Sequence, residues 1–231
     1  MSLKLNYLDR VTRQSTANLV LFCNEKLSIS SLKKYISEDE HSYISDLVKT
    51  SDIKKNLFVF KVHSKKTIFL ISIKKDLKTF DIENLGAELF SQIKNEKKND
   101  YSVIADSIES KNKNFLGHFL HGLKLKSYEF KKYKSKKDKK VISVNVYGNK
   151  NKPSKLTKLK FKALEEGTFY ARDLVSEPGN VLHPDEYAKR INSLKKDGLK
   201  INIYDEKKLK KLGMHALLGV GRGSIRGSYL V

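Results

Sequence analysis

The sequence predicts an α/β protein with a first domain of alternating strands and helices, a bridging helix, and the opening β/α units of a second domain. Three observations predict this class. Short apolar runs of strand type alternate with amphipathic helical segments up to about residue 150. The segment Asn149–Ser154 then lacks aliphatic and aromatic residues, and a helical stripe begins at Leu156. We therefore expect a domain at 1–150, a bridging helix and linker at 151–178, and part of a further domain at 179–231.

Within the first domain, the spacing of apolar residues distinguishes strands from helices. The runs Phe58–Val62 and Thr67–Ile73 are rich in aromatic and β-branched residues and flank a polar tetrapeptide, which predicts neighbouring strands. Asp81 is placed to cap an amphipathic helix that extends to about Asn95. The remaining elements expected are strands at Asn18–Phe22, Tyr101–Ala105 and Val141–Val146, and a helix over Phe115–Leu123.

The bridging helix is predicted from a stripe at three- and four-residue steps, formed by Leu156, Leu159, Ala163, Tyr170, Ala171 and Leu174. Pro178 and Gly179 end this helix, because proline removes a donor and glycine permits a chain reversal. Pro184 opens the next helix, where a missing N–H costs nothing. Beyond that helix, apolar runs predict strands at Leu199–Ile203, Ala216–Val220 and Tyr229–Val231.

The charge of the chain has two interpretations. The formal net charge is +21, and of the 47 basic residues six are Arg. A basic surface favours nucleic acid or anionic membrane, but Arg is the usual residue for bidentate phosphate contacts. We therefore interpret the lysine excess as background composition, with nucleic-acid binding as the alternative. That alternative centres on Lys131–Lys140, beside Tyr128, Phe130 and Tyr133, although a solvated loop is the preferred interpretation of this run.

Cysteine usage and hydropathy indicate the compartment. Cys23 is the only cysteine in the sequence, so no disulfide forms within the chain, and a reducing setting is favoured. The first residues do not form a signal peptide, and no apolar segment approaches the roughly 20 residues that a membrane span needs. We expect a cytoplasmic protein with no membrane partner.

The histidines are weak candidates for chemistry. His118 and His121 can share one helix face, but no carboxylate or cysteine accompanies them, so packing is favoured over a metal site. His183 precedes a helix start, where capping or packing is the preferred role.

The remaining candidates are also interpreted as structural. Arg172 and Asp173 lie on the bridging helix as an ion pair or an interdomain contact. The run Gly219–Ser224 has neither the dinucleotide-binding nor the P-loop spacing, and we interpret it as a glycine turn between two strands. No catalytic, metal-binding or substrate-binding residue is predicted.

Three segments carry a family resemblance. They are Gly122-Leu123 with Ser127-Tyr128-Glu129-Phe130 and Tyr133-Lys134, then Arg172-Asp173-Leu174-Val175 with Pro178, Asn180 and His183-Pro184, and finally Gly213–Ser224. In this order and spacing they resemble the leucyl aminopeptidase family (cytosol aminopeptidase, peptidase M17). The resemblance covers its N-terminal domain and the start of its catalytic domain.

This resemblance implies a function for the parent enzyme. It implies a macro-domain-like N-terminal domain with a mixed sheet, a zinc-peptidase-like catalytic domain, and a cytoplasmic homohexamer. It also implies two divalent ions, Mn or Zn, about 3.5 Å apart, that help to release N-terminal amino acids from peptides. The family's Gly-Lys-Gly, Phe-Asp-x-Gly-Gly and Asn-Thr-Asp-Ala-Glu-Gly-Arg motifs do not occur in this sequence. We therefore expect an N-terminal portion of the enzyme that binds no metal and is inactive alone, and that stops at Val231 within an apolar run.

The alternative is a stand-alone macro-like module that binds nucleotide or nucleic acid. Such binding requires close approach of the backbone to a diphosphate, normally through glycine-rich loops. Residues 1–150 contain Gly86, Gly117, Gly122 and Gly148, with no two adjacent or alternating. The glycine content therefore disfavours this alternative.

Overall fold

The computed structural model describes residues 2–9, 18–52, 54–64, 66–135 and 140–231. Its contacts divide the chain into unit 1, Met1–Phe169, and unit 2, Tyr170–Val231. The division falls inside the long helix α4 (Lys155–Ser176), so this helix contributes to both units. Each unit is described by itself below.

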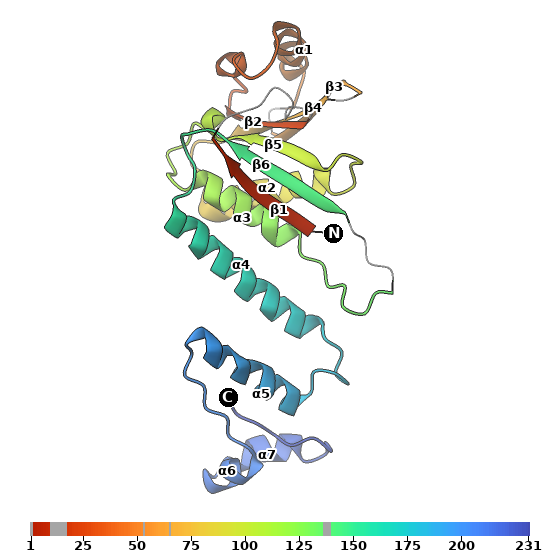
Figure 1. Cartoon of the computed structure of the whole chain (residues 1–231), viewed down its shortest axis with the longest axis vertical. Helices are drawn as coiled ribbons and strands as arrows, with labels where there is room; N and C mark the ends of the chain where they lie inside the picture. Colours follow the sequence, from red (N-terminus) through yellow and green to blue (C-terminus); the bar gives the residue numbers. More distant parts are fainter. Residues whose placement is uncertain (1, 10–17, 53, 65, 136–139) are drawn as a thin grey trace. The chain divides into compact units, whose positions relative to one another are not determined.

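Unit 1 is built on a six-stranded mixed sheet (Figure 1). The strand order is β1-β6-β5-β2-β4-β3, and β3 is antiparallel to β4 while all other neighbours are parallel. The strands are β1 (Ser2–Leu8), β2 (Asn18–Asn24), β3 (Leu57–His63), β4 (Lys66–Ile73), β5 (Asp100–Ile104) and β6 (Val141–Tyr147). The predicted pairing of β3 with β4 is confirmed, and the edge strand β1 was not predicted.

Helices cover both faces of this sheet. They are α1 (Glu38–Lys49), α2 (Thr79–Ile93) and α3 (Phe115–Lys126). Alternate residues of β2 point to opposite faces, so that Val20 and Phe22 pack in the cluster with α2 and α3, while Leu19 and Leu21 pack with Ile44 of α1. The predicted helices at 81–95 and 115–123 are confirmed as α2 and α3. The prediction that Asp81 caps α2 is wrong: Lys78 is the N-cap, and Asp81 lies in the first turn, where its Oδ2 accepts from the Lys78 N–H at 2.9 Å.

The contact between α2 and α3 depends on two glycines. A Cβ atom at Gly86 would lie 1.9 Å from the Phe119 carbonyl oxygen, and one at Gly122 would lie 1.9 Å from the Glu83 carbonyl oxygen. Only glycine permits the two backbones to approach this closely. The two helices therefore pack as one layer on the sheet.

Helix α4 begins at Lys155 and packs against α3 within unit 1. The Ser154 hydroxyl accepts a hydrogen bond from the Thr157 N–H at 3.1 Å. A Cβ atom at Gly117 would lie 2.5 Å from the Phe161 ring, which shows how closely α4 approaches α3 there. The helix predicted from the apolar stripe is confirmed over Lys155–Ser176, and its role as a bridge between two domains stays a prediction.

Unit 2 contains helices and a single bridge between extended residues. After α4 come α5 (Pro184–Asn192), the 3₁₀ helix η4 (Ser193–Asp197), α6 (Glu206–Lys211) and α7 (His215–Gly221). Tyr204 and Leu230 exchange backbone hydrogen bonds of 2.8 and 3.0 Å. The helix predicted at Pro184 is confirmed as α5.

The three strands predicted for unit 2 are wrong for this structure. Residues 216–220 lie inside α7, and residues 199–203 and 229–231 form no named strand. A strand needs a neighbour to satisfy its N–H and C=O groups, whereas a helix satisfies them internally. Unit 2 contains one bridge pair, so its apolar runs lack partners for a sheet.

Two further features concern the lysine-rich run and membrane spans. Of Lys131–Lys140, residues 136–139 lie outside the described residues, and 131–135 form no helix or strand. Across the described ranges, no helix combines the length and the apolar character that crossing a bilayer requires.

Candidate functional site

The carboxyl edge of the sheet in unit 1 is the expected position of a ligand site. In open α/β sheets, ligands bind outside the carboxyl ends of the strands. Two hollows of about 550 and 440 Å³ lie there and share Glu25, Lys74 and Lys75 in their linings. Both signs of charge line them, so neither has the uniformly basic character expected of a phosphate site.

The loop after β6 binds a carboxylate of the protein itself. The Asn149 N–H donates to both oxygens of Asp106, at 3.0 and 3.2 Å, and the Lys150 N–H donates to Asp106 Oδ1 at 2.7 Å. Gly148 has φ +130°, and a Cβ atom there would lie 2.6 Å from Asp106 Oδ1. Successive amides of this kind form anion-binding nests. Because Asp106 already satisfies them, this loop offers no free cradle to a diphosphate.

The histidines of α3 pack against α4. His118 Nδ1 lies 3.1 Å from Glu83 Oε1, and the rings of His118 and His121 lie 5.0 and 5.1 Å from that of Phe161. Burial lowers the pKa of His121, so the imidazole is neutral at pH 7. In the part of the chain that the structure describes, no three His, Cys, Asp or Glu residues are grouped to hold a metal ion.

Unit 2 has a polar cluster where α5 begins. His183 occupies the N-cap but makes no capping bond with its side chain; its Nδ1 instead contacts Asp185 Oδ1. Arg226 Nη1 lies 3.3 Å from Asp185 Oδ2. This contact joins the start of α5 to the segment after α7, residues that are 41 positions apart.

Arg190 extends this cluster toward the end of α4. Its Nη1 donates to Glu177 Oε1 and its Nε to Glu186 Oε1, both at 3.0 Å, and its carbonyl accepts from the Tyr170 hydroxyl at 3.1 Å. The Glu177 side chain is 2% exposed. The hydrogen bonds to Glu186 and Glu177 raise the pKa of Arg190, and the Arg190 bond lowers the pKa of Glu186. We interpret the cluster as a clasp that holds α5 to the end of α4.

Two other sequence candidates lack reactive surroundings. Gly219–Ser224 begins in the last turn of α7, so the interpretation as a turn between two strands is wrong. Cys23 is buried in β2, and burial raises the pKa of its thiol to about 12. A thiol with this pKa is an inert packing group at neutral pH.

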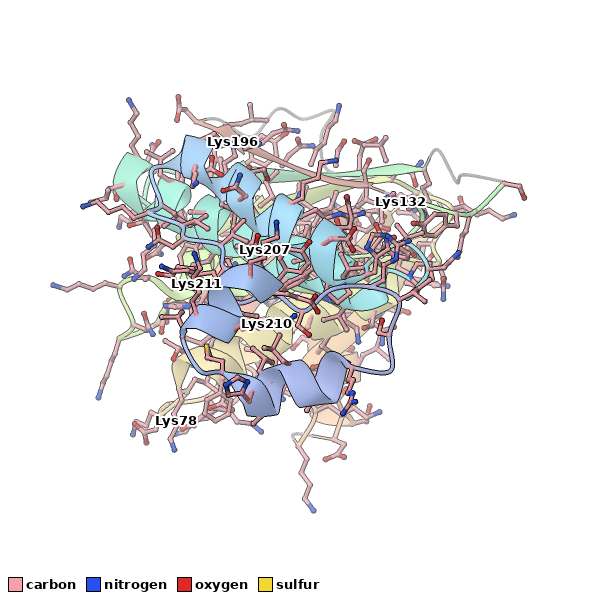
Figure 2. The ribbon with its side chains drawn as sticks, turned by 90° about the horizontal axis from the view of Figure 1, so that it is seen from below. Lys78, Lys132, Lys196, Lys207, Lys210 and Lys211 are labelled. Atoms are coloured by element: carbon pink, nitrogen blue, oxygen red, sulfur yellow. The ribbon has the colours of Figure 1, made fainter. Side chains whose placement is uncertain are left out.

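The lysines are distributed over both units rather than along one stripe. Figure 2 labels Lys78 and Lys132 of unit 1 and Lys207, Lys210 and Lys211 of α6, so lysines lie on elements of both units. A nucleic-acid site normally concentrates such charges on one face. This distribution is consistent with background composition, and that interpretation stays a prediction.

The fold and the polar clusters define a two-part α/β protein, and its described residues include no group of three metal-ligating side chains. Models of the cytosol aminopeptidase family match both parts: its N-terminal domain matches residues 20–137 and its catalytic domain matches residues 169–231. The chain therefore belongs to the cytosol aminopeptidase family.

Individual relatives agree with this assignment. A probable cytosol aminopeptidase of Ehrlichia ruminantium (strain Gardel) is 37% identical over 153 residues, which are 64% of this chain and 30% of the relative. A tomato leucine aminopeptidase mutant has a TM-score of 0.75 at 19% identity, covering 99% of this chain and 50% of the other. The bottromycin maturation enzyme BotP in complex with Mn has a TM-score of 0.66 at 16% identity, covering 93% and 44%. The chain spans about a third or less of the curated relatives it matches.

Proposed function

We propose that this chain supplies the N-terminal domain and the opening of the catalytic domain of a cytosol aminopeptidase. The parent enzyme is a two-metal exopeptidase that releases N-terminal amino acids from peptides, in the cytoplasm and as a homohexamer. The observation that carries this proposal is the agreement of two boundaries. The catalytic-domain match begins at residue 169, and the contacts of the structure separate unit 2 at Tyr170.

The finer fold assignment belongs to the same proposal. A mixed sheet of order β1-β6-β5-β2-β4-β3 with helices on both faces supports a macro-domain-like arrangement for unit 1. The satisfied amides at Asp106 favour a structural role for this domain over nucleotide binding. The stand-alone module is therefore the weaker candidate.

The metals of the parent enzyme are assigned to other parts of its catalytic domain. Two-metal hydrolases hold their ions with several carboxylates that face one site. The described residues of this chain present no such donor set, so they do not fit the pair of ions. The cluster of His183, Asp185 and Arg226 is not a metal site, because the Asp185 carboxylate already contacts His183 and Arg226.

The exposed apolar residues of unit 2 support a role within a larger domain. Val175, Val220 and Ile225 are 87%, 88% and 100% exposed. Apolar side chains this exposed would lose unfavourable contact with water on packing against a neighbouring element. We propose that these three residues pack against the part of the family's catalytic domain that this chain does not span.

A hybrid chain tests the proposal. Residues 1–231 are joined to the remaining catalytic segment of the Ehrlichia ruminantium relative, and hydrolysis of L-leucine amide is measured with and without Mn²⁺. We expect Mn-dependent turnover by the hybrid and none by the 231 residues alone. The catalytic segment without this chain is the control. Turnover by the 231 residues alone, or a cooperatively folded hybrid without activity, would contradict the proposal.

A further inference from the structure

A third hollow in unit 1 lies apart from the carboxyl-edge hollows. Its volume is about 400 Å³, and its lining comes from β1, the α3 helix and the first half of α4. Figure 1 shows these three elements as neighbours at the β1 edge of the sheet. Hollows of this volume accommodate small molecules.

The deeper part of the hollow is apolar. Leu3 of β1 and Leu120 of α3 are buried, and Phe161 of α4 packs closely over Gly117. Because Leu3 and Leu120 belong to the core cluster of the sheet, this part of the apolar wall is formed before any ligand arrives. It suits an aliphatic or aromatic body rather than a sugar.

The mouth of the hollow is cationic. Its lysines are Lys4, Lys124, Lys158 and Lys162, against one acidic residue, Glu165. Lys124 pairs with Glu165 at 3.3 Å, and Lys162 pairs with Glu166 at 3.7 Å. The Lys158 ammonium lies 3.7 Å from the centre of the Tyr7 ring, and no described carboxylate lies within 4.0 Å of it. Lys4 also forms no ion pair with a described carboxylate, so Lys4 and Lys158 are both available to an anionic group, and the charge of Lys158 also acts on the Asp9 carboxyl. Of the two lysines, Lys158 lies against the Tyr7 ring.

Tyr7 adds a donor beside that cation. Burial, followed by the charge of Glu165, raises the pKa of the Tyr7 phenol, so the hydroxyl stays protonated at neutral pH. A protonated phenol and an ammonium over its ring face are complementary to a carboxylate. A basic ligand would instead meet an excess of positive charge.

The edge of β1 is less suited to a peptide strand. Its Leu3 carbonyl accepts from Lys124 Nζ at 2.7 Å, and its Leu8 carbonyl accepts from Lys152 Nζ at 2.8 Å. Lysines at an edge strand are a common means of preventing strand addition. The hollow beneath the edge is therefore a better site than the edge itself.

We propose that this hollow binds small monocarboxylates with an apolar body, with the carboxylate at Lys158 and Tyr7 and the body against Leu120 and Phe161. The site is independent of the proposed aminopeptidase function. Two sources share this chemistry, a free apolar amino acid and a simple carboxylic acid. They differ in the α-ammonium group, which in an amino acid would face Glu165.

Titration of the 231-residue chain by NMR with three matched probes tests the proposal. The probes are 4-methylpentanoate, L-leucine, which adds the α-ammonium group, and 4-methylpentylamine, which replaces the carboxylate. A ligand of this size is expected to bind with Kd of order 1 mM. We expect shifts of β1, α3 and α4 resonances with at least one of the two carboxylates and none with the amine.

Two variants identify the anchoring groups. Lys158→Gln should weaken carboxylate binding by about tenfold, because it removes a charge-assisted hydrogen bond. Lys160→Gln, at an exposed position on the same helix, is the matched control and should leave it unchanged. If free amino acids are the natural ligands, Glu165→Gln should weaken the binding of L-leucine and leave that of 4-methylpentanoate unchanged. If simple carboxylic acids are the natural ligands, this variant should weaken the binding of neither probe. Three results would overturn the proposal. They are binding of the amine as tight as that of the acids, equal Kd values for the acids in the Lys158 and Lys160 variants, and no resonance shifts at probe concentrations up to about 10 mM.

Discussion

Unit 1 and unit 2 differ in how completely they bury their apolar residues. Unit 1 has a core on each face of its sheet, with fully buried Phe22, Phe69 and Phe119. In unit 2, all of whose residues are described, the buried apolar residues are Leu174, Ala188 and Leu209. Burial of apolar area is the main favourable contribution to folding. Unit 1 therefore has the core of an independent domain, whereas unit 2 depends on helices, one bridge and an ion-pair cluster.

Truncation of a buried side chain should show the largest difference in stability between the two units. Phe119 is fully buried and its ring lies 5.2 Å from that of Phe22. Phe119→Ala should lower the free energy of unfolding by about 3–5 kcal/mol, because it leaves a cavity. The control Val220→Ala, at a position 88% exposed in unit 2, should change it by less than about 0.5 kcal/mol. Urea denaturation followed by circular dichroism measures both, and equal losses would contradict the difference in cores.

A pair of glycine substitutions sharpens the same comparison. Gly86→Ala places a methyl group 1.9 Å from a backbone oxygen of α3, so α2 and α3 must separate. We expect the free energy of unfolding to fall by at least about 1–3 kcal/mol. Gly219→Ala in α7 meets no atom within 4 Å and should be neutral or slightly stabilising. Thermal unfolding of both variants gives the result, and a stable Gly86 variant would contradict the close packing.

The clasp in unit 2 should control local opening rather than global stability. Arg190→Ala leaves the Glu177 carboxylate, which is 2% exposed, without its Arg190 partner. We expect thermolysin to cleave the chain after Pro178 several times faster, while the core of unit 1 stays intact. Lys196→Ala, at an exposed lysine of η4 with no described ion pair to the clasp, is the control. An unchanged cleavage rate in the Arg190 variant would mean that the clasp does not hold α5.

We also expect unit 2 to lose stability at a higher pH than unit 1 on acidification. This effect should be smaller than those of the substitutions above. The bond from Arg190 lowers the pKa of Glu186; for Asp185, burial acts to raise the pKa, but hydrogen bonds from its own N–H and His183 lower it overall. A depressed folded pKa gives stability that is present above the usual value of about 4 and lost as the pH falls through the folded value. In unit 1, burial raises the pKa of Glu88 and Glu165, so their protonation costs no stability, but hydrogen bonds from Lys152 and Lys131 lower the pKa of Asp9 and Glu129. For Glu40, burial acts to raise the pKa, but the hydrogen bond from Lys66 helps to lower it overall. Acid therefore removes stability from both units, and the larger core of unit 1 should keep it folded to a lower pH. Amide protection in α5 should be constant from about pH 7 to 5 and fall below about pH 4. Parallel loss in both units would contradict this assignment.

Sequence patterns predicted the elements whose structure depends on local spacing. They failed for elements whose structure depends on residues distant in the sequence. The stripes of α2, α3 and α4 and the pairing of β3 with β4 were predicted because their spacing reports one buried face. The strand β1 was not predicted, although Leu3, Leu5 and Tyr7 alternate with Lys4 and Asn6 at the strand period; its partner β6 lies about 140 residues away. The strands of unit 2 were predicted from apolar runs, but a run does not form a sheet without neighbours.

The sites depended even more on distant residues. Asp106 meets the amides of Asn149 and Lys150 across more than 40 residues, and no local pattern indicates that bond. The hollow beneath β1 combines residues near positions 3, 120 and 160. Spacing could identify the family segments but not these contacts, because each is created by the sheet order.

Hydrogen exchange of the intact 231-residue chain, followed by mass spectrometry of its peptides, tests the central claim most directly. We expect peptides from β2, β4 and β5 to exchange only with global unfolding, while those from α5, α6 and α7 exchange by separate local opening at a lower free energy. Peptides of unit 2 that are as strongly protected as the strands of unit 1 would contradict the claim, because unit 2 would then be a complete domain with a core of its own.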